Sequence, residues 1–154
     1  LHEALLRINT GHNIQFLIVG KINFCLSSKF KTKQFGLVKD STLLNIILNA
    51  ADAIIIPSRE DNLPNVMIES LAVGTPIIGT PIGGINDLLV KDDKLGISSE
   101  NTSPEKFAHA IDLFLRTKDS FKREYIHDFA MTNFDSHVIA NQHINLYKNV
   151  LDSD

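Results

Sequence analysis

The sequence has few cysteines and no long apolar run, and these absences exclude several classes of protein. Its 154 residues include one cysteine, two methionines and no tryptophan. The lone Cys25 excludes an internal disulfide and fits a reducing compartment, and no histidine accompanies it in a motif typical of a reactive thiol. The apolar runs are far shorter than the roughly 20 residues needed to cross a bilayer, so we expect no transmembrane segment.

The sequence also lacks an excess of positive charge. It has 15 Lys and Arg residues against 18 Asp and Glu residues, which gives a formal net charge of −3. Nucleic-acid binders usually carry a basic surface, so we expect no nucleic-acid partner. The histidines are scattered without HExxH or CxxC spacing, so we expect no bound metal. Among them, His137 and His143 are expected to be solvent-facing residues of a helix.

Length and composition fit one domain. A chain of 154 residues with 44% hydrophobic residues is large enough to bury a core. It opens as L-H-E-A-L-L-R-I, the pattern of the second half of an amphipathic helix, without an initiator methionine or a signal peptide. We therefore expect residues 1–154 to form a single domain whose natural start lies upstream.

Apolar runs alternate with helical patterns over the first hundred residues. Expected strands cover 13–20, 35–38, 53–57, 75–79 and 96–98, and the first reads as buried on both faces. Expected helices cover 41–50 with Ser41 as cap, 65–73, 85–89 after a turn at Gly83 and Gly84, 104–116 with Ser103 as cap, 120–132 and 136–151. This alternation predicts an α/β fold, a Rossmann-like parallel sheet with helices on both faces and C-terminal helices.

A basic run, Lys29, Lys31 and Lys33, lies between the first two expected strands. The simplest interpretation is a solvated loop or a sheet edge. The alternative interpretation is a surface that contacts phosphate or an acidic partner.

Charge is scarcest between Asp61 and Asp87, where Glu69 is the only charged residue. A surface helix would carry several charges and an unpaired buried carboxylate is costly, so Glu69 is expected to have a polar partner. In parallel sheets ligands bind at the carboxyl ends of the strands. The strand at 53–57 leads through S-R-E-D-N-L-P-N into a helix whose free N–H groups favour phosphate.

Glu69 lies about 8 Å along this helix from its first turn, and helical side chains lean toward the N-terminus. It could therefore accept hydrogen bonds from the two neighbouring hydroxyls of a ribose. Three alternatives stay open at this point. Glu69 could pair internally with a backbone N–H or a lysine, Asp61 could cap the helix, and Asn62 could either cap it or bind the ligand.

The segment P-S-R-E-D-N-L-P-N-V-M-I-E-S-L-A-V-G-T-P-I-I-G resembles the nucleotide-sugar-binding half of the group 1 glycosyltransferases, the retaining family with the GT-B double-Rossmann fold. Asp61 and Glu69 match the family's acidic residue, seven intervening residues and glutamate. The pieces A-D-A-I-I-I-P-S, G-T-P-I-I-G and G-G-I-N-D match in order and spacing. The likeness runs more loosely from Asn13 to the closing F-D-S-H-V-I-A-N-Q-H-I-N-L-Y, which implies most of the C-terminal domain without the N-terminal acceptor domain.

The resemblance implies a role for each matching residue. Glu69 would hold the ribose hydroxyls of the nucleotide and Asp61 the hydroxyls of the transferred sugar, as the two carboxylates of the catalytic site. Leu37 and Val38 fall where the family's loop lines the base. Contacts with the sugar and diphosphate are implied for Ser58, Asn62, Leu63, Pro64, Gly83 and Gly84.

The family transfers a sugar from a nucleotide-sugar to a hydroxyl with retention of configuration, usually without a metal, so no cofactor is expected beyond the donor substrate. The acceptor, a glycan or lipid-linked saccharide in polysaccharide biosynthesis, would bind through the missing N-terminal domain. We expect a cytoplasmic protein, peripheral at the inner membrane face.

The sequence also departs from the family pattern. Asp61 is one methylene shorter than the usual glutamate, with Glu60 beside it, and Asp87 replaces another glutamate. The basic residues that neutralise the diphosphate would lie upstream, so we expect the isolated chain to transfer sugar poorly. Two alternative functions are a glycoside hydrolase with Asp61 and Glu69 as facing carboxylates, and a non-catalytic nucleotide-binding or partner-binding module on the same fold.

Overall fold

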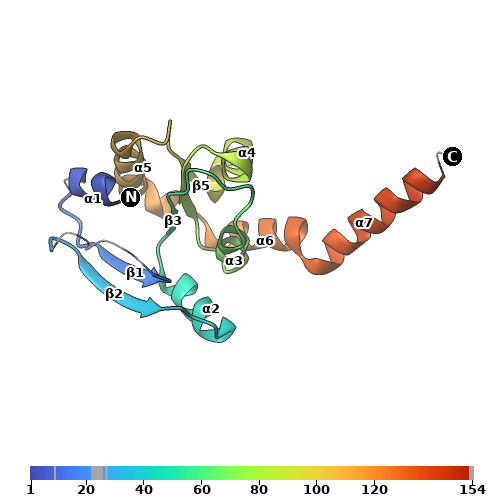
Figure 1. The fold of residues 1–154 in the computed structure, drawn as a ribbon, viewed down its shortest axis with the longest axis horizontal. Helices are drawn as coiled ribbons and strands as arrows, with labels where there is room; N and C mark the ends of the chain where they lie inside the picture. The colour runs from blue at the N-terminus through green and yellow to red at the C-terminus, as the bar shows by residue number, and fades with distance from the viewer. Residues whose placement is uncertain (9, 22–25, 27, 153–154) are drawn as a thin grey trace.

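The computed structural model describes residues 1–8, 10–21, 26 and 28–152, so Cys25 lies outside the described residues (Figure 1). The elements in chain order are α1 (His2–Arg7), β1 (Gln15–Val19), β2 (Lys31–Gly36), α2 (Ser41–Ala50), β3 (Ile54–Ile56), α3 (Asn65–Ala72), β4 (Ile77–Gly79), α4 (Gly83–Lys91), β5 (Gly96–Ser98), α5 (Pro104–Thr117), α6 (Arg123–Phe134) and α7 (Ser136–Leu151). Two short 3-10 helices, η1 (Asp93–Leu95) and η2 (Lys118–Ser120), precede β5 and α6.

The described strands all pair in parallel, but they form two sheets where the sequence predicted one. β1 pairs with β2, and the second sheet has the order β3-β4-β5. Neighbouring residues of β4 point to opposite faces: Ile77 packs in a cluster with α3, α4 and α6, and Ile78 packs in a cluster with α1 and α5. Helices thus cover both faces of the three-stranded sheet, as the α/β prediction requires.

The first sheet differs most from the prediction. β1 is not buried on both faces, since its end residues Gln15 and Val19 are exposed and its centre is half-buried. β2 covers Lys31–Gly36 and not 35–38, because its first four residues are polar and exposed and carry no hydrophobic alternation. Lys31 and Lys33 therefore lie on the exposed outer strand of this sheet, a position that both interpretations of the basic run allow.

Several helix boundaries also shift by a few residues. Asp40 caps α2 in place of Ser41, and its Oδ1 accepts the N–H of Thr42 at 2.8 Å. α4 begins at Gly83, so the glycine pair forms its first turn and does not precede it. α6 begins three residues later than predicted, because Lys118–Ser120 form a separate 3-10 helix. Ser103 caps α5 as predicted, accepting the N–H of Lys106 at 3.3 Å.

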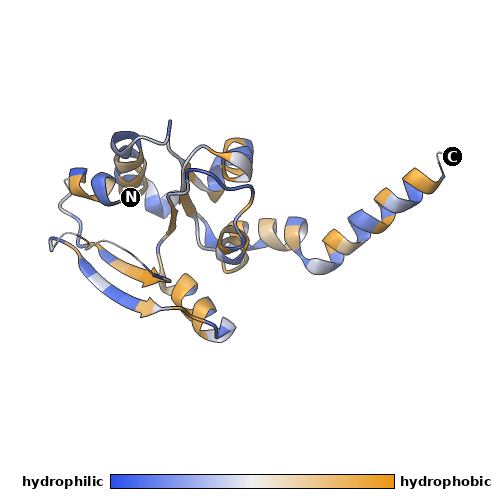
Figure 2. Ribbon diagram, viewed as in Figure 1, coloured by the Kyte–Doolittle hydropathy of each residue, from blue (hydrophilic) through white to orange (hydrophobic). Residues whose placement is uncertain are grey.

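α7 projects away from the rest of the molecule, which Figure 1 shows as a red helix reaching the C-terminus. None of its residues is buried, and the predicted exposure of His137 and His143 is confirmed. Figure 2 shows hydrophobic residues along this exposed helix as well as inside the body. In the described part of the chain, no helix combines the length and the apolar character needed to span a membrane.

Candidate functional site

The site is built on the carboxyl ends of the strands β3, β4 and β5. Thr80 follows β4 and is buried. Its N–H donates to the carbonyl of Ile56 at 3.3 Å and its hydroxyl to the carbonyl of Ser58 at 2.5 Å, so the ends of β3 and β4 are held together. Ser99 follows β5, and its N–H donates to the carbonyl of Gly79 at 2.9 Å. These bonds fix the point from which the acidic loop at 58–64 leaves the sheet.

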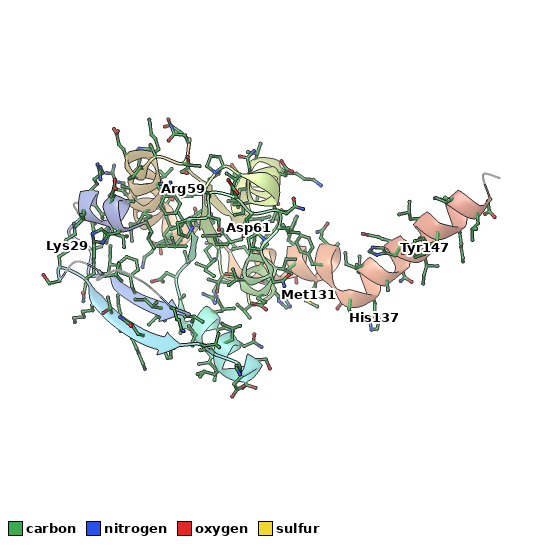
Figure 3. All side chains as sticks on the ribbon, in the orientation of Figure 1. Lys29, Arg59, Asp61, Met131, His137 and Tyr147 are labelled. Carbon is green, nitrogen blue, oxygen red and sulfur yellow. The ribbon has the colours of Figure 1, made fainter. Side chains whose placement is uncertain are left out.

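The acidic loop packs directly against the start of α4. The N–H of Gly84 donates to the carbonyl of Asn62 at 2.5 Å. A Cβ added at Gly83 would lie 2.2 Å from the carbonyl oxygen of Asp61, and one added at Gly84 would lie 2.6 Å from that of Asn62. Two segments that are 22 residues apart in the sequence therefore meet, and only glycine permits this approach. Figure 3 places Asp61 between α3 and α4.

The loop leads into α3 without a side-chain cap. Pro64 occupies the N-cap position, so neither Asp61 nor Asn62 caps this helix and both capping alternatives are wrong. Asp61, Asn62 and Leu63 are exposed, and Pro64 is half-buried. The backbone N–H groups at the start of α3 remain suited to an anion, because a helix N-terminus carries partial positive charge.

Glu69 lies on the outer face of α3. The buried residues of this helix are Met67, Ser70 and Leu71. At about 3.6 residues per turn, Glu69 points roughly 200° away from Met67 and is exposed. It forms no hydrogen bond or ion pair with any described residue, so the alternative of an internal partner for Glu69 is not supported there. Its carboxylate is open to solvent.

The residues predicted to line the base lie in a different segment, between β2 and α2. The side chain of Leu37 is 72% exposed, while Val38 is half-buried. Among the described residues, no hydrogen bond joins this segment to the acidic loop. The structure therefore gathers Ser58, Asp61, Asn62, Gly83 and Gly84 into one region and leaves Leu37 and Val38 on a separate segment.

The two hollows found in the described residues lie elsewhere. One, of about 270 Å³, lies between α1 and α5. The other, of about 110 Å³, lies beside Asp52 and Arg123. Neither includes a predicted site residue. No three His, Cys, Asp or Glu residues of the described chain come together in a way that could hold a metal ion.

Sequence reasoning missed Thr80 and Ser99, which shape the site without facing it. Both are buried polar residues placed directly after a strand. A small hydroxyl residue at the end of each apolar run, as in I-I-G-T and G-I-S-S, was the available signal. The hydroxyls of such side chains form hydrogen bonds with backbone groups at the ends of the sheet.

The family model described as "Glycosyl transferases group 1" matches residues 1–117. The chain belongs to this family. Over 161 aligned residues it is 27% identical to an uncharacterized glycosyltransferase of Methanocaldococcus jannaschii, covering 96% of this chain and 40% of that protein. Over 73 residues it is 33% identical to a D-inositol 3-phosphate glycosyltransferase of Corynebacterium urealyticum, covering 47% of this chain and 17% of that protein.

A solved structure supports the same fold. Sucrose-phosphate synthase from Thermosynechococcus elongatus superposes with a TM-score of 0.67 at 22% identity, over 80% of this chain and 31% of that chain. This likeness shows that the chain adopts the Rossmann-like fold of a GT-B glycosyltransferase. The chain spans less than half the length of each of these group 1 relatives.

Proposed function

We propose that this chain is the donor-binding domain of a retaining glycosyltransferase. The observation that carries the proposal is the pair of exposed carboxylates at the carboxyl edge of a parallel sheet: Asp61 precedes the N-terminus of α3, which has no side-chain cap, and Glu69 lies on the outer face of the same helix. Exposed Glu69 has no internal partner among the described residues, so its carboxylate can accept hydrogen bonds from a ligand. Membership of the family supports sugar transfer as the overall chemistry.

In this proposal the diphosphate of a nucleotide-sugar accepts hydrogen bonds from the backbone at the start of α3. Glu69 accepts hydrogen bonds from the ribose hydroxyls, and Asp61 accepts them from the transferred sugar. The side chain of Leu37 is exposed, so the base can pack against it. Ser58, Gly83 and Gly84 position the loop, and no metal or cofactor takes part.

We further propose that the acceptor binds to a part of the protein outside these 154 residues. The acceptor would be a glycan or lipid-linked saccharide of polysaccharide biosynthesis, and the enzyme would be cytoplasmic at the inner membrane face. The projecting helix α7 supports an additional domain, because its exposed large residues share one broad face of the helix: Ile144, Leu146, Tyr147, Val150 and Leu151. An apolar helix face of this width is normally covered in a folded protein.

Calorimetry tests the donor site directly. UDP, GDP and ADP are titrated into the wild-type chain and into Glu69→Gln, with Glu105→Gln on the exposed surface of α5 as the matched control. We expect one nucleotide to bind, and Glu69→Gln to weaken it about 10- to 100-fold, since a hydrogen bond to a charged group contributes about 1.5–3 kcal/mol. Equal affinities for Glu69→Gln and Glu105→Gln would refute the role of Glu69.

Asp61 has a separate test that uses the donor's own sugar. Asp61→Asn should leave the affinity for the nucleoside diphosphate unchanged and weaken the affinity for the complete nucleotide-sugar, because only the latter carries the transferred sugar. A radiolabelled nucleotide-sugar assay should show no efficient transfer by the 154 residues alone. Turnover by the isolated chain would contradict the proposal that a second domain is required.

A further inference from the structure

The region around β2 and α2 carries a charge opposite to that of the rest of the chain. Residues 13–39 contain five lysines and no Asp or Glu. The remaining residues contain ten basic and 18 acidic side chains, so a segment of net charge +5 sits in a chain whose other residues total −8. A sign asymmetry of this size indicates an anionic partner.

Three lysines of this segment, Lys31, Lys33 and Lys39, are exposed, and Asp40, the N-cap of α2, follows the last of them. Lys31 and Lys33 lie on β2, the outer strand of its sheet, and Lys39 follows in the segment before α2. None of these three side chains forms an ion pair with a described residue. The Nζ of Lys33 lies 5.0 Å from the centre of the Phe35 ring, so the ammonium is held close to apolar surface.

Helix α2 continues from β2 and adds exposed apolar side chains. It contains no charged residue, and it buries Ile47 and Leu48 on one side. Beside these buried residues Leu43 and Ile46 are 38% and 60% exposed, and the opposite side of the helix carries the polar residues Thr42, Asn45 and Asn49. The apolar face of α2 is therefore wider than the part that the described residues bury, and its exposed margin can contact a partner.

β2 and α2 together form the lower edge of the molecule in Figure 1, away from α4 and α5. Figure 2 shows a hydrophilic strand running into a largely hydrophobic helix at this edge. We define Lys31, Lys33, Lys39, Leu43 and Ile46 as the β2–α2 surface. It is separate from the acidic loop and from α7, although Leu37, which is proposed to contact the base, lies between Lys33 and Lys39.

We propose that the β2–α2 surface binds an anionic lipid bilayer, with the lysines at the headgroups and Leu43 and Ile46 inserted at the interface. A soluble polyanion would account for the lysines alone, and lysines on an edge strand also prevent strand-to-strand aggregation. Neither accounts for the adjacent apolar stripe, whereas membrane surfaces attract both kinds of side chain. A second copy of the chain is disfavoured, because it would bring two lysine-rich edges together. The inference does not rest on the proposed donor site.

Vesicle co-sedimentation of the 154-residue chain tests this proposal. Vesicles of phosphatidylcholine alone are compared with vesicles of an equal mixture of phosphatidylcholine and phosphatidylserine. We expect binding to the anionic vesicles, weakening as salt is raised, and little binding to the neutral ones. Each lysine near an anionic surface contributes about a fivefold gain in partitioning, so Lys31→Glu with Lys33→Glu should lower partitioning at least about 30-fold.

Two further variants make the result specific. Lys91→Glu with Lys148→Glu changes the net charge equally at exposed positions elsewhere and should bind almost as the wild type does. Leu43→Asn with Ile46→Asn should lower partitioning about tenfold without unfolding the chain, since both side chains are exposed. Circular dichroism and urea unfolding confirm that each variant is folded.

Several outcomes would overturn the proposal. Equal binding to neutral and anionic vesicles, unaffected by Lys31→Glu with Lys33→Glu, would assign the contact to the apolar face of α7. Binding to soluble polyglutamate as tight as to vesicles, with no effect of Leu43→Asn and Ile46→Asn, would assign the surface to an acidic polymer. Absence of vesicle binding would leave the lysines as protection of the sheet edge. Calorimetric titration of the same variants with nucleotide tests the donor site independently, so failure of the membrane proposal can be told apart from failure of the donor-site proposal.

Discussion

The contact between the acidic loop and α4 yields the sharpest prediction, on Gly83→Ala. Gly83 has φ +43°, and a Cβ there would lie 2.2 Å from the carbonyl oxygen of Asp61. Gly36 has a comparable φ of +64°, but a Cβ there would meet nothing within 4 Å. Gly36→Ala is therefore a matched control, because it introduces the same backbone strain of about 1–2 kcal/mol without the collision.

The collision adds a second cost that the control lacks. The Asp61 carbonyl must move about 1 Å to restore ordinary contact, and this movement disrupts the hydrogen bond between Gly84 N–H and Asn62, worth about 1 kcal/mol. We expect Gly83→Ala to lower the free energy of unfolding by about 2–3 kcal/mol, against about 1–2 kcal/mol for Gly36→Ala. A domain of ordinary stability still folds after either change.

Urea unfolding measures the difference in stability between the two variants. Calorimetry with the nucleotide-sugar measures the difference in their donor affinity. Displacement of the loop should weaken donor binding at least about tenfold in Gly83→Ala, equivalent to about 1.4 kcal/mol, and leave Gly36→Ala close to the wild type. If the two variants have the same stability and the same donor affinity, the loop does not press on α4 in solution and the site geometry described above is wrong.

Three further predictions concern the scaffold. The Arg123 guanidinium donates to carbonyls of Asn49 and Ala51 and to the Thr75 hydroxyl, at 2.9–3.1 Å. Arg123→Met should therefore lower the free energy of unfolding in urea by about 2 kcal/mol, against about 0.5 kcal/mol or less for Arg116→Met, which breaks only an exposed bridge to Asp112. The hydrogen bond from Lys106 holds the pKa of Glu100 below its usual value, so this pair stabilises the fold at neutral pH and loses its effect as pH falls through that pKa. NMR titration should show the pKa rising in Lys106→Met. The hydrogen bond to Asp92 raises the pKa of Tyr125, so its stabilising effect is lost as pH rises through the raised value. Ultraviolet titration of the phenolate should show a lower pKa in Asp92→Asn.

Local signals predicted the elements whose ends are determined by nearby residues. Ser103 and Pro104 mark the start of α5 because a hydroxyl cap and a first-turn proline act within one turn. α7 was predicted over its observed length. The start of β2 was missed because Lys31–Gln34 are polar and are recognised as a strand only through their pairing with β1. The separation of the strands into two sheets likewise depends on contacts between distant segments.

The site was predicted as a set of residues but not as a surface. The resemblance placed Asp61 and Gly83 in one site, yet only the fold shows that they touch through backbone atoms. The apolar stretch around Glu69 led to the expectation of a polar partner, either a ligand or an internal group. Much of that apolar character belongs to β4, which is buried, and to the inner face of α3, while Glu69 occupies the outer face. The composition of a stretch therefore did not reveal the burial of a single residue in it.

The arrangement of charges at the site restricts which ligands fit the proposal. The start of α3 offers N–H donors without a side-chain cap, whereas α2 and α7 are capped by Asp40 and Asp135. A phosphate can supply the missing acceptor, but ionised Asp61 and Glu69 only accept hydrogen bonds and repel phosphate. Each carboxylate therefore selects a hydroxyl-bearing group near the anion. A nucleotide-sugar has hydroxyls on both sides of its diphosphate, the ribose on one and the transferred sugar on the other, so it satisfies both carboxylates and the helix end together.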